Sequence, residues 1–525
     1  MRRTVLPFRA LTVAFACILG LAMFPLGIRA QEVDMERYIT LTVKKGETIV
    51  LSLSGLENNT PVRIVSGETD FTTSVDTTIG EIMRRIDAKA STMTIYGRVQ
   101  CLDCSNNGEN VTALDGSHNG LLTMLGCYEN QLTSLDVRHN ERLTVLNCSS
   151  NQLTSLDVSH NERLTALVCY ENRLTSLDVS HNELLTMLAC YGNQLTSLNI
   201  SHNELLTTLA CYENQLTSLN VSHNTQLYRI NCSKNRISSL DVSRNTMLED
   251  LTCNSNRLTA LDLRNNPELK ALDCAANQLS ALNLRNNPHL NVLYCYANRL
   301  TSLDVSRNTM LEGLLGNSNR LTSLDVSHNP ELKALDCANN RITALDLRNN
   351  PNLSILFCFT NLLTSLDVSR NTMLESLLCH NNQITSLNLR HNQALAQLHC
   401  SNNRITSLDV SHNSELQTLD CAENQLTALD VSKNSKLTAA LCWGNRLSTG
   451  AWNRFFCSLP DRSYMPNEQI IYPLGNQSDS QKPQVLAANG NIARRKGWEV
   501  SYYNDGQDTP ITGFTGSYRC TKIYK

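Results

Sequence analysis

The stretch Leu153–Arg173, LTSLDVSHNERLTALVCYENR, is one copy of a 21-residue unit that fills most of the chain. A fixed period of this length is typical of proteins built from stacked structural repeats. One cysteine marks each copy, and only Gly316 interrupts the series between positions 127 and 442. The cysteines of the series are Cys127, Cys148, Cys169, Cys190, Cys211, Cys232, Cys253, Cys274, Cys295, Cys337, Cys358, Cys379, Cys400, Cys421 and Cys442.

Each repeat consists of two similar halves with the pattern L-x-x-L-x-(V/C)-x-x-N. The alternation of apolar and outward positions predicts a short strand in each half. The matching positions are Leu153, Leu156, Val158 and Asn161 in the first half, and Leu164, Leu167, Cys169 and Asn172 in the second. The pattern resembles the leucine-rich-repeat signature over residues 99–446. It predicts a leucine-rich-repeat solenoid, which is a curved right-handed coil of about 17 turns with a parallel β-sheet.

The overall composition excludes some classes of partner. The chain has 525 residues, a net charge of −3 and a pI of about 6.5. This balance provides no electrostatic attraction for nucleic acid or an anionic membrane. Length is a poor guide to domain number here, because a solenoid grows by adding coils. We expect a monomer that needs no cofactor.

Residues 1–30 have the features of a secretory signal peptide. Arg2 and Arg3 precede a mostly apolar run, and Ala30 ends a small-residue cleavage site. A membrane anchor is the competing interpretation, but Pro25 breaks the run, which is short for a bilayer span. No second apolar segment of spanning length follows. We therefore expect an exported protein, secreted or located at the cell surface, without membrane insertion once the signal is removed.

Exported proteins with many cysteines usually contain disulfides. Cysteines one coil apart, however, would point the same way at about 4.7–4.9 Å, whereas disulfide-bonded Cβ atoms face each other at about 3.8 Å. We therefore interpret the repeat cysteines, such as Cys148 and Cys169, as buried thiols that pack as small apolar groups. Cys457 and Cys520 lie outside the series and are a candidate disulfide between C-terminal segments.

Two asparagine positions are the same in every regular repeat. One series runs from Asn130 to Asn445, and the other runs from Asn140 to Asn434. An unsatisfied buried amide would cost about 1–3 kcal/mol, so these side chains are expected to bond the backbone of their own and neighbouring coils. We interpret them as structural residues, represented by Asn151, Asn161 and Asn172.

Residues 31–98 are expected to form a β-rich N-terminal cap over the open end of the solenoid. The runs ITLTV and IVLSL within Tyr38–Leu53, joined by KKGE, predict a β-hairpin. Pro61–Val65 is a third expected strand. The spacing of apolar residues in Thr78–Ile86 predicts a short helix.

Residues 447–504 are expected to form an α/β C-terminal cap, because the period stops at Leu447. An apolar stripe at helical spacing, Trp452, Phe455, Phe456 and Leu459, ends at Pro460. Further expected elements are a strand at Gln469–Leu474, a helix at Val485–Lys496 and a strand at Trp498–Tyr503. Residues 505–525 are expected to be a polar tail with one strand at Gly516–Tyr524.

The outward positions on either side of the repeat cysteine vary from copy to copy, unlike the structural positions. Packing alone tolerates this variation, and exposed aromatic residues are favoured at interfaces, so this sheet face is the candidate ligand-binding surface. Aromatic columns that merely stack and stabilise the sheet are an equally compatible interpretation. The candidate residues are Tyr128, Tyr170, Tyr191, Tyr212, Tyr294, Tyr296, Phe357, Phe359 and Trp443.

A histidine column raises the question of a metal site. His139, His160 and His181 occupy equivalent positions, and such neighbours would be able to share a metal or titrate together near pH 6. Arginine, asparagine or lysine replaces histidine in other repeats, which favours a solvated turn. The sequence contains no nucleophile elbow, phosphate loop or histidine–glutamate metal motif. We therefore predict neither a metal site nor an enzyme.

The consensus LTSLDVSxNxxLxxLxCxxNQ is similar to the repeat of internalin-J-like leucine-rich-repeat proteins of bacteria. The segment from NRLSTGAWNRFFCSLPDR to ARRKGWEV resembles the sequence that follows such repeats in Bacteroidetes-type proteins. The resemblance implies a curved solenoid, export, and adhesion to host or bacterial partners. The expected β-rich N-terminal cap departs from the helical cap of internalins, and no LPxTG sorting signal ends the sequence.

Two functional hypotheses follow. The first is a binding or adhesion protein that holds a host-cell or bacterial surface protein on its sheet face. The second is a structural or biofilm-matrix component without a single specific ligand. A carbohydrate ligand stays open under the first hypothesis, since tyrosine rings also stack on sugars.

Overall fold

The computed structural model describes residues 32–78, 84–464, 469–476, 478–503 and 509–520. The predicted signal peptide, residues 1–30, lies outside this part of the chain. Two compact units, Met1–Leu195 and Thr196–Lys525, make up the chain, and each is described by itself.

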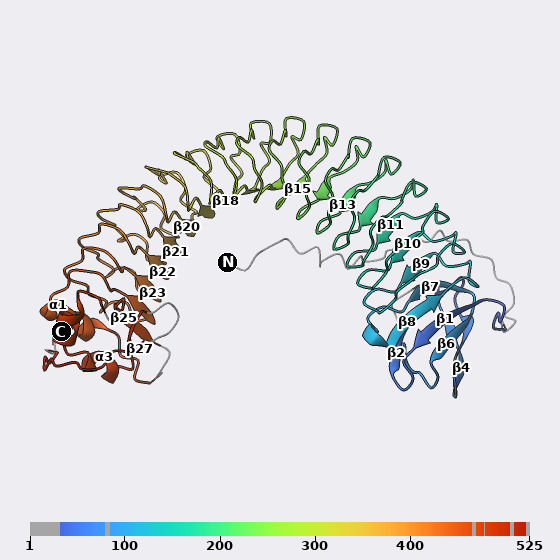
Figure 1. Cartoon of the computed structure of the whole chain (residues 1–525), viewed down its shortest axis with the longest axis horizontal. Coiled ribbons are helices and arrows are strands. Elements are labelled where there is room, and N and C mark those ends of the chain that lie inside the picture. Colours follow the sequence, from blue (N-terminus) through green and yellow to red (C-terminus); the bar gives the residue numbers. More distant parts are fainter. Residues whose placement is uncertain (1–31, 79–83, 465–468, 477, 504–508, 521–525) are drawn as a thin grey trace. The chain divides into compact units, whose positions relative to one another are not determined.

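In both units, each repeat forms one coil with a short strand at the same place, which has three residues in every coil but the first (Figure 1). The coil strands of the first unit are β7 (Val99–Asp103), β9 (Met124–Gly126), β10 (Val145–Asn147), β11 (Ala166–Val168) and β12 (Met187–Ala189). Those of the second unit are β13 (Thr208–Ala210), β14 (Arg229–Asn231), β15 (Asp250–Thr252), β16 (Ala271–Asp273), β17 (Val292–Tyr294), β18 (Gly313–Leu315), β19 (Ala334–Asp336), β20 (Ile355–Phe357), β21 (Ser376–Leu378), β22 (Gln397–His399), β23 (Thr418–Asp420) and β24 (Ala439–Leu441).

Neighbouring coil strands within a unit pair in parallel and in register. Leu146 of β10 lies beside Leu167 of β11, and both side chains are fully buried. In most coil strands the residues on either side of the central apolar residue are only partly buried, so they form the outer face of the sheet, while β12, β13 and β14 bury one or both of them. Burying such a leucine contributes roughly 1.5–3 kcal/mol, which one isolated coil would not gain. The predicted leucine-rich-repeat solenoid with a parallel sheet is confirmed.

The strand expected in the first half of each repeat is wrong for most coils. Among the described residues, this half forms a strand in one repeat, β8 (Val111–Asp115), and elsewhere contributes only isolated bridges, such as Asp304 with Asp325. A side chain takes the place of a strand partner here, because the Leu153 N–H donates to Asn172 Oδ1 at 2.9 Å. The coil therefore carries one sheet, on the side of its second half.

The N-terminal part of the first unit is β-rich. Its strands are β1 (Tyr38–Val43), β2 (Thr48–Gly55), β3 (Thr60–Ser66), β4 (Thr69–Val75), β5 (Arg84–Asp87), β6 (Thr92–Gly97) and β8 (Val111–Asp115), with a 3-10 turn at Gly108–Asn110. Five of them form a sheet in the order β4-β3-β6-β1-β8. Strand β2 pairs instead with β5 and with the first coil strand, β7.

The predicted hairpin of β1 and β2 is wrong, although both strands exist. Strand β1 pairs with β6 and β8, whereas β2 has β5 and β7 as neighbours. The connecting turn bonds to a distant residue, with the Gly46 N–H donating to the Ala88 carbonyl at 2.7 Å. Alternation of residues predicted the strands, but it does not specify which strands pair.

The predicted helix at Thr78–Ile86 is wrong for Arg84–Ile86, which belong to strand β5, while residues 79–83 lie outside the described residues. Ile86 pairs with Ile49 of β2, and both side chains are buried. The expected third strand is confirmed as β3.

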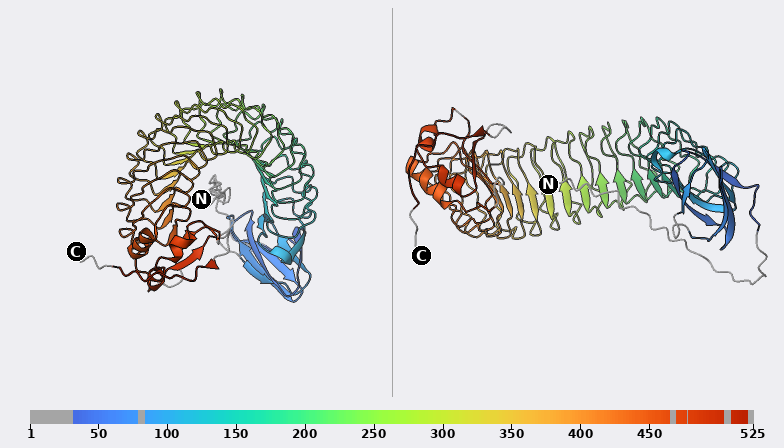
Figure 2. Two further views of the ribbon diagram at one scale, coloured as in Figure 1. Left: turned by 60° about the vertical axis from the view of Figure 1, so that its left-hand side comes forward. Right: turned by 90° about the horizontal axis from the view of Figure 1, so that it is seen from below.

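The second unit ends in an α/β cap whose helices lie at its C-terminal end (Figure 2). Its elements are α1 (Thr449–Ser458), β25 (Ile470–Leu474), α2 (Lys482–Leu486), α3 (Asn491–Arg495), β26 (Glu499–Tyr502) and β27 (Thr509–Pro510). The predicted helical stripe is confirmed, since Trp452, Phe455 and Phe456 of α1 are fully buried. Strand β25 continues the parallel sheet beside β24.

The single helix expected at Val485–Lys496 is wrong, because it is divided into α2 and α3. Asn489, between them, is held by two contacts: its N–H donates to Asn453 Oδ1 at 2.9 Å, and its Nδ2 donates to the Tyr518 carbonyl at 2.8 Å. Gly490 packs against the Phe514 ring, where a Cβ would lie 2.3 Å from a ring carbon. These long-range contacts replace the local helical bonds.

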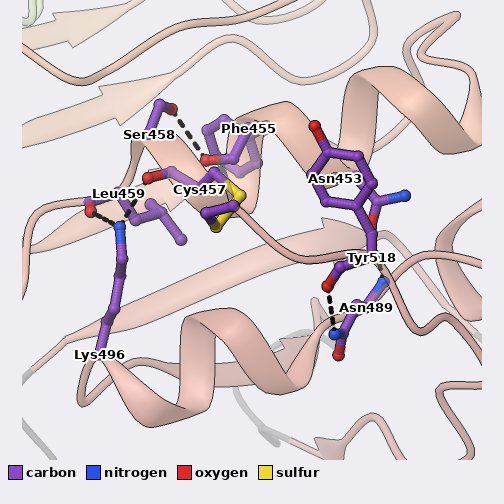
Figure 3. The surroundings of a disulfide bond; sticks show 9 residues. Asn453, Phe455, Cys457, Ser458, Leu459, Asn489, Lys496 and Tyr518 are labelled. Carbon is purple, nitrogen blue, oxygen red and sulfur yellow. Dashed lines mark hydrogen bonds between the residues drawn. A yellow bond between two sulfur atoms is a disulfide. The ribbon is translucent and has the colours of Figure 1, made fainter. Parts of the chain in front are cut away.

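The C-terminal segment is bound to this cap by a disulfide between Cys457 and Cys520 (Figure 3). Close to it, Lys496 Nζ donates to the backbone carbonyls of Cys457 and Leu459 at 2.6 and 2.5 Å (Figure 3). Residues 516–520 contain no strand, so the strand expected at Gly516–Tyr524 is wrong for its described part, and residues 521–524 lie outside it.

Candidate recognition face

The invariant positions of the repeat face inward and hold neighbouring coils together. Asn172 Nδ2 donates to the carbonyls of Cys148, one coil away, and of Cys169 in its own coil, at 3.0 and 3.2 Å. Its Oδ1 accepts the Leu153 N–H. Every hydrogen-bonding group of this amide is therefore used within the fold, and none is available to a ligand. Asn151 has the same arrangement in the preceding coil.

The second asparagine ladder joins the coils through hydrogen bonds that the side-chain amide N–H groups donate. Asn161 is fully buried, and its Nδ2 donates to the carbonyls of Val137 and Asn140 at 2.9 Å each. Both acceptors belong to the preceding coil. The two ladders thus join successive coils at the two turns of each repeat.

The repeat cysteines are fully buried or nearly so, and they contain free thiols. Burial raises the pKa of Cys148 and Cys190 to about 12. A thiol that stays protonated is neither a nucleophile nor a metal ligand at neutral pH. The ladder is apolar packing, as inferred for Cys148 and Cys169.

The sheet face, as the term is used below, consists of the first and third residue of each coil strand and the residue that follows the cysteine. In one coil these are Ala166, Val168 and Tyr170, all partly exposed. All nine predicted aromatic residues lie on this face and are partly exposed. Tyr128, Tyr170 and Tyr191 belong to the first unit, and Tyr212, Tyr294, Tyr296, Phe357, Phe359 and Trp443 belong to the second.

Several of these rings contact each other or neighbouring side chains. Tyr170 and Tyr191 stack with centroids 4.2 Å apart and planes 7° apart. Phe359 stacks on His380 at 4.5 Å. The Tyr128 hydroxyl accepts a hydrogen bond from Asn106 Nδ2 at 2.8 Å. The rings are therefore ordered by the sheet while part of their surface stays exposed.

The strand residue before the cysteine carries a carboxylate in some coils. Asp273 and Asp336 each accept the N–H of the residue two places on, Ala275 and Ala338, at 3.1 Å. Burial raises the pKa of both carboxyl groups to about 6. Asn231 forms the same bond in its coil, so the bond itself does not require a charge.

The histidine column lies on exposed turns. His160 Nδ1 contacts Ser159 Oγ at 3.1 Å, and His181 contacts Ser180 in the same way. Within the residues that the structure describes, no three histidine, cysteine, aspartate or glutamate side chains come together as a metal site would require.

A hollow of about 370 Å³ opens on the sheet face of the second unit, next to the cap. Sequence reasoning singled out one of its lining residues, Trp443, as a contact residue, placed His380 and Leu441 among the variable outward positions, and missed the others. The lining residues are His380, Asn381, Ser401, Asn402, Asp420, Glu423, Leu441, Trp443 and Tyr503. Tyr503 follows β26 and stacks on Trp443 at 5.8 Å, a contact between the coil and the cap that the repeat pattern does not encode.

Comparison with solved structures gives the same architecture. The functional domain of InlJ from Listeria monocytogenes, which includes a cysteine ladder, is 36% identical with a TM-score of 0.57, over 68% of this chain and 76% of that one. The leucine-rich-repeat protein LIC12759 from Leptospira interrogans is 23% identical with a TM-score of 0.56, over 65% and 89%. The plant peptide hormone receptor RGFR1, solved in complex with RGF2, is 19% identical with a TM-score of 0.54, over 71% and 70%. No protein-family profile and no curated protein matches the sequence.

Stacked coils with one short parallel strand each, inward leucines and two asparagine ladders define a leucine-rich-repeat protein. At 36% identity over most of the InlJ domain, and with the same cysteine ladder, the chain belongs to the internalin-J-like leucine-rich-repeat family. Every helix in the described part of the chain is too short or too polar to cross a lipid bilayer.

Proposed function

We propose that this chain is a secreted or surface-located bacterial protein that binds a protein partner through its sheet face. One observation carries the proposal. The leucines, cysteines and asparagines that recur from repeat to repeat are buried, whereas the variable positions beside the cysteine are partly exposed in most coils and hold nine aromatic side chains. Aromatic residues are enriched where proteins bind one another, since they give a large contact area at a low entropic cost.

The same proposal assigns the parts of the exported chain. Residues 1–30 act as the signal peptide, residues 31–98 and 447–504 close the two ends, residues 99–446 form the solenoid, and residues 505–525 follow as a tail. The partner is a protein of the host-cell or bacterial surface.

The mature chain, immobilised through its N-terminus, is the reagent for testing this proposal against extracts of host-cell surfaces. Replacement of Tyr170, Tyr191 and Tyr212 with serine is expected to reduce capture of the partner about tenfold or more, because the anchoring rings are lost. Replacement of His160, His181 and His202 with serine is the matched control, since these exposed turn residues come from the same three repeats. Equal capture by both variants would contradict a binding role for the face.

One observation favours the second candidate, a structural or matrix component. Tyr170 and Tyr191 stack in parallel, so one face of each ring already packs against the other ring within the protein. Under this alternative, the tyrosine variant loses stability, measured by urea unfolding, and no surface protein is captured by any form of the chain.

A further inference from the structure

The hollow beside the C-terminal cap contains two hydrogen-bond acceptors, Asn402 Oδ1 and the Glu423 carboxylate, that no donor in the described part of the chain uses. Three side chains at the same place in successive coils form a directed chain, in which Asn402 Nδ2 donates to Asn381 Oδ1 at 2.7 Å and Asn381 Nδ2 donates to Thr360 Oγ1 at 3.4 Å. The chain ends on Asn402 Oδ1, an acceptor. The next residue of this column is Glu423, which is a second acceptor.

Glu423 lacks the counterion that an equivalent glutamate has. In another coil of the same unit, Glu213 forms an ion pair with Lys234, which occupies the same column one coil later. The residue one coil after Glu423 is Gly444, and the Glu423 side chain lies so close over it that a Cβ there would be 2.7 Å from the carboxyl carbon. Among the described residues, no lysine or arginine lines the hollow.

Two further carboxylates add negative charge near Glu423: Asp420, which lines the hollow, and Asp479, whose charge acts on Glu423. Asp420 is fixed by Ser401 Oγ, which donates to its Oδ2 at 2.6 Å, and by the Ala422 N–H. Burial, together with the charge of Asp479, raises the pKa of Glu423. His380 does not compensate, since its burial lowers its pKa and keeps the ring neutral at pH 7.

An aromatic wall completes the hollow. Trp443 stacks with Tyr503, and the turn at Gly475 packs against the indole so closely that a Cβ would lie 2.8 Å from a ring carbon. The indole is therefore held in place beside the carboxylates. Trp is the aromatic side chain that attracts cations most strongly, and a planar guanidinium both stacks on it and pairs with a carboxylate.

We propose that this hollow binds an arginine side chain of the protein partner, with its guanidinium held by Glu423, Asn402 Oδ1 and the Trp443 indole. The inference rests on the proposed function, because it names the chemistry of the partner at one end of the sheet face. Arginine fits better than a sugar because the site offers acceptors to a donor-only group and contains negative charge without a cation.

The test uses calorimetric titration of the mature chain with the blocked peptide acetyl-Gly-Arg-Gly-amide. The same peptide with citrulline, which keeps the shape of arginine and lacks its charge, is the ligand control. The arginine peptide is expected to bind at least about tenfold more tightly than the citrulline peptide, and added salt should weaken it. Equal affinities, or no binding of either peptide, would overturn the proposal.

Two protein variants test the contribution of the Glu423 carboxylate to binding. Glu423→Gln removes the charge from a side chain for which burial and the charge of Asp479, and no hydrogen bond, set the pKa within the described residues, so the variant should fold normally and bind the arginine peptide about tenfold more weakly. Glu129→Gln, at the equivalent position of another coil, should bind like the unmodified chain. Binding of a neutral methyl glycoside that depends on Trp443 and not on Glu423 would identify a sugar site and contradict the proposal. Because the peptide needs no natural partner, its failure leaves the tyrosine capture experiment unaffected.

Discussion

The regular coils and the C-terminal cap are stabilised in opposite ways. In the coils, the partner of a residue is the same kind of residue one coil away, as for Leu146 and Leu167. In the cap, each contact joins two different segments that no repeat relates, and the partners are far apart in sequence, as for Cys457 with Cys520 and Asn453 with Asn489. The coil therefore distributes its stability over many equivalent contacts, whereas the cap depends on a few individual ones.

Removing the cap disulfide is the largest expected perturbation. The double variant Cys457→Ser, Cys520→Ser frees a loop of 63 residues, which should reduce the stability of the cap by about 4 kcal/mol. Hydrogen exchange should show faster opening of α1 to α3 and unchanged protection of the coils of the first unit. A reductant should reproduce this effect in the unmodified chain, because the coil thiols are already free. Equal loss of protection in coils and cap would contradict the comparison.

A buried ladder asparagine should matter far more than its exposed neighbour. Asn266 is fully buried and donates to the carbonyls of Val242 and Asn245 at 3.0 and 2.8 Å. Asn266→Ala removes both of these buried bonds, although each carbonyl keeps a backbone N–H donor, and should lower the free energy of unfolding by about 1–3 kcal/mol. Asn265→Ala, an exposed residue with one bond to Ser243, should cost less than about 0.5 kcal/mol. Similar losses in urea unfolding would show that burial in the ladder is not the cause.

The carboxylates on the sheet face should make the coils of the second unit sensitive to pH. The folded-state pKa of Asp273 and Asp336 is about 6, above the usual value, so the folded protein binds these protons more tightly than the unfolded chain. Their contribution is therefore most favourable below pH 4 and is lost as the pH rises through 6. The double variant Asp273→Asn, Asp336→Asn should be about 1–2 kcal/mol more stable than the unmodified chain at pH 8, with the difference vanishing near pH 4.

Asn231 shows that the amide is accepted in this column. Asp325→Asn is the control, since hydrogen bonds from Ser327 lower the pKa of that exposed carboxyl. A constant difference between the double variant and the unmodified chain at pH 4 and pH 8 would rule out the buried carboxylates as the source.

Filling the gap in the cysteine ladder should give a small gain. A Cβ added at Gly316 would meet Cys295 Sγ at 3.8 Å and nothing closer, so Gly316→Ala should stabilise the second unit by about 0.5–1 kcal/mol. Gly192→Ala is the opposite case, because Gly192 has a φ of +63° and a Cβ would lie 3.2 Å from Glu171 Cγ. It should destabilise the first unit. The two melting temperatures should move in opposite directions, and a shift of the same sign would contradict this account.

The contrast between repeated and unique contacts also explains which parts of the structure the sequence predicted. The coil strands, the inward leucines and the buried asparagines follow from a period that is visible in the chain itself. The pairing of β1 and β2 and the break between α2 and α3 depend on residues such as Ala88 and Phe514, which no periodicity connects to them. On the sheet face, the aromatic positions followed from variation between copies. The hollow around Glu423 did not, because Tyr503 reaches it from the cap and the missing counterion is visible only by comparison with Lys234.

The central claim is that the buried ladders hold the fold while the variable sheet-face residues bind the partner. The most direct measurement compares two variants of the second unit for affinity to the captured partner and for thermal stability. One carries serine at Tyr294, Tyr296, Phe357 and Phe359, and the other carries serine at Met247, Met310 and Met373, which are 53%, 52% and 57% exposed outside that face. We expect the first variant to lose binding about tenfold or more while both keep melting temperatures close to that of the unmodified chain. Retained affinity in the first variant, or loss of binding in the second alone, would contradict the claim.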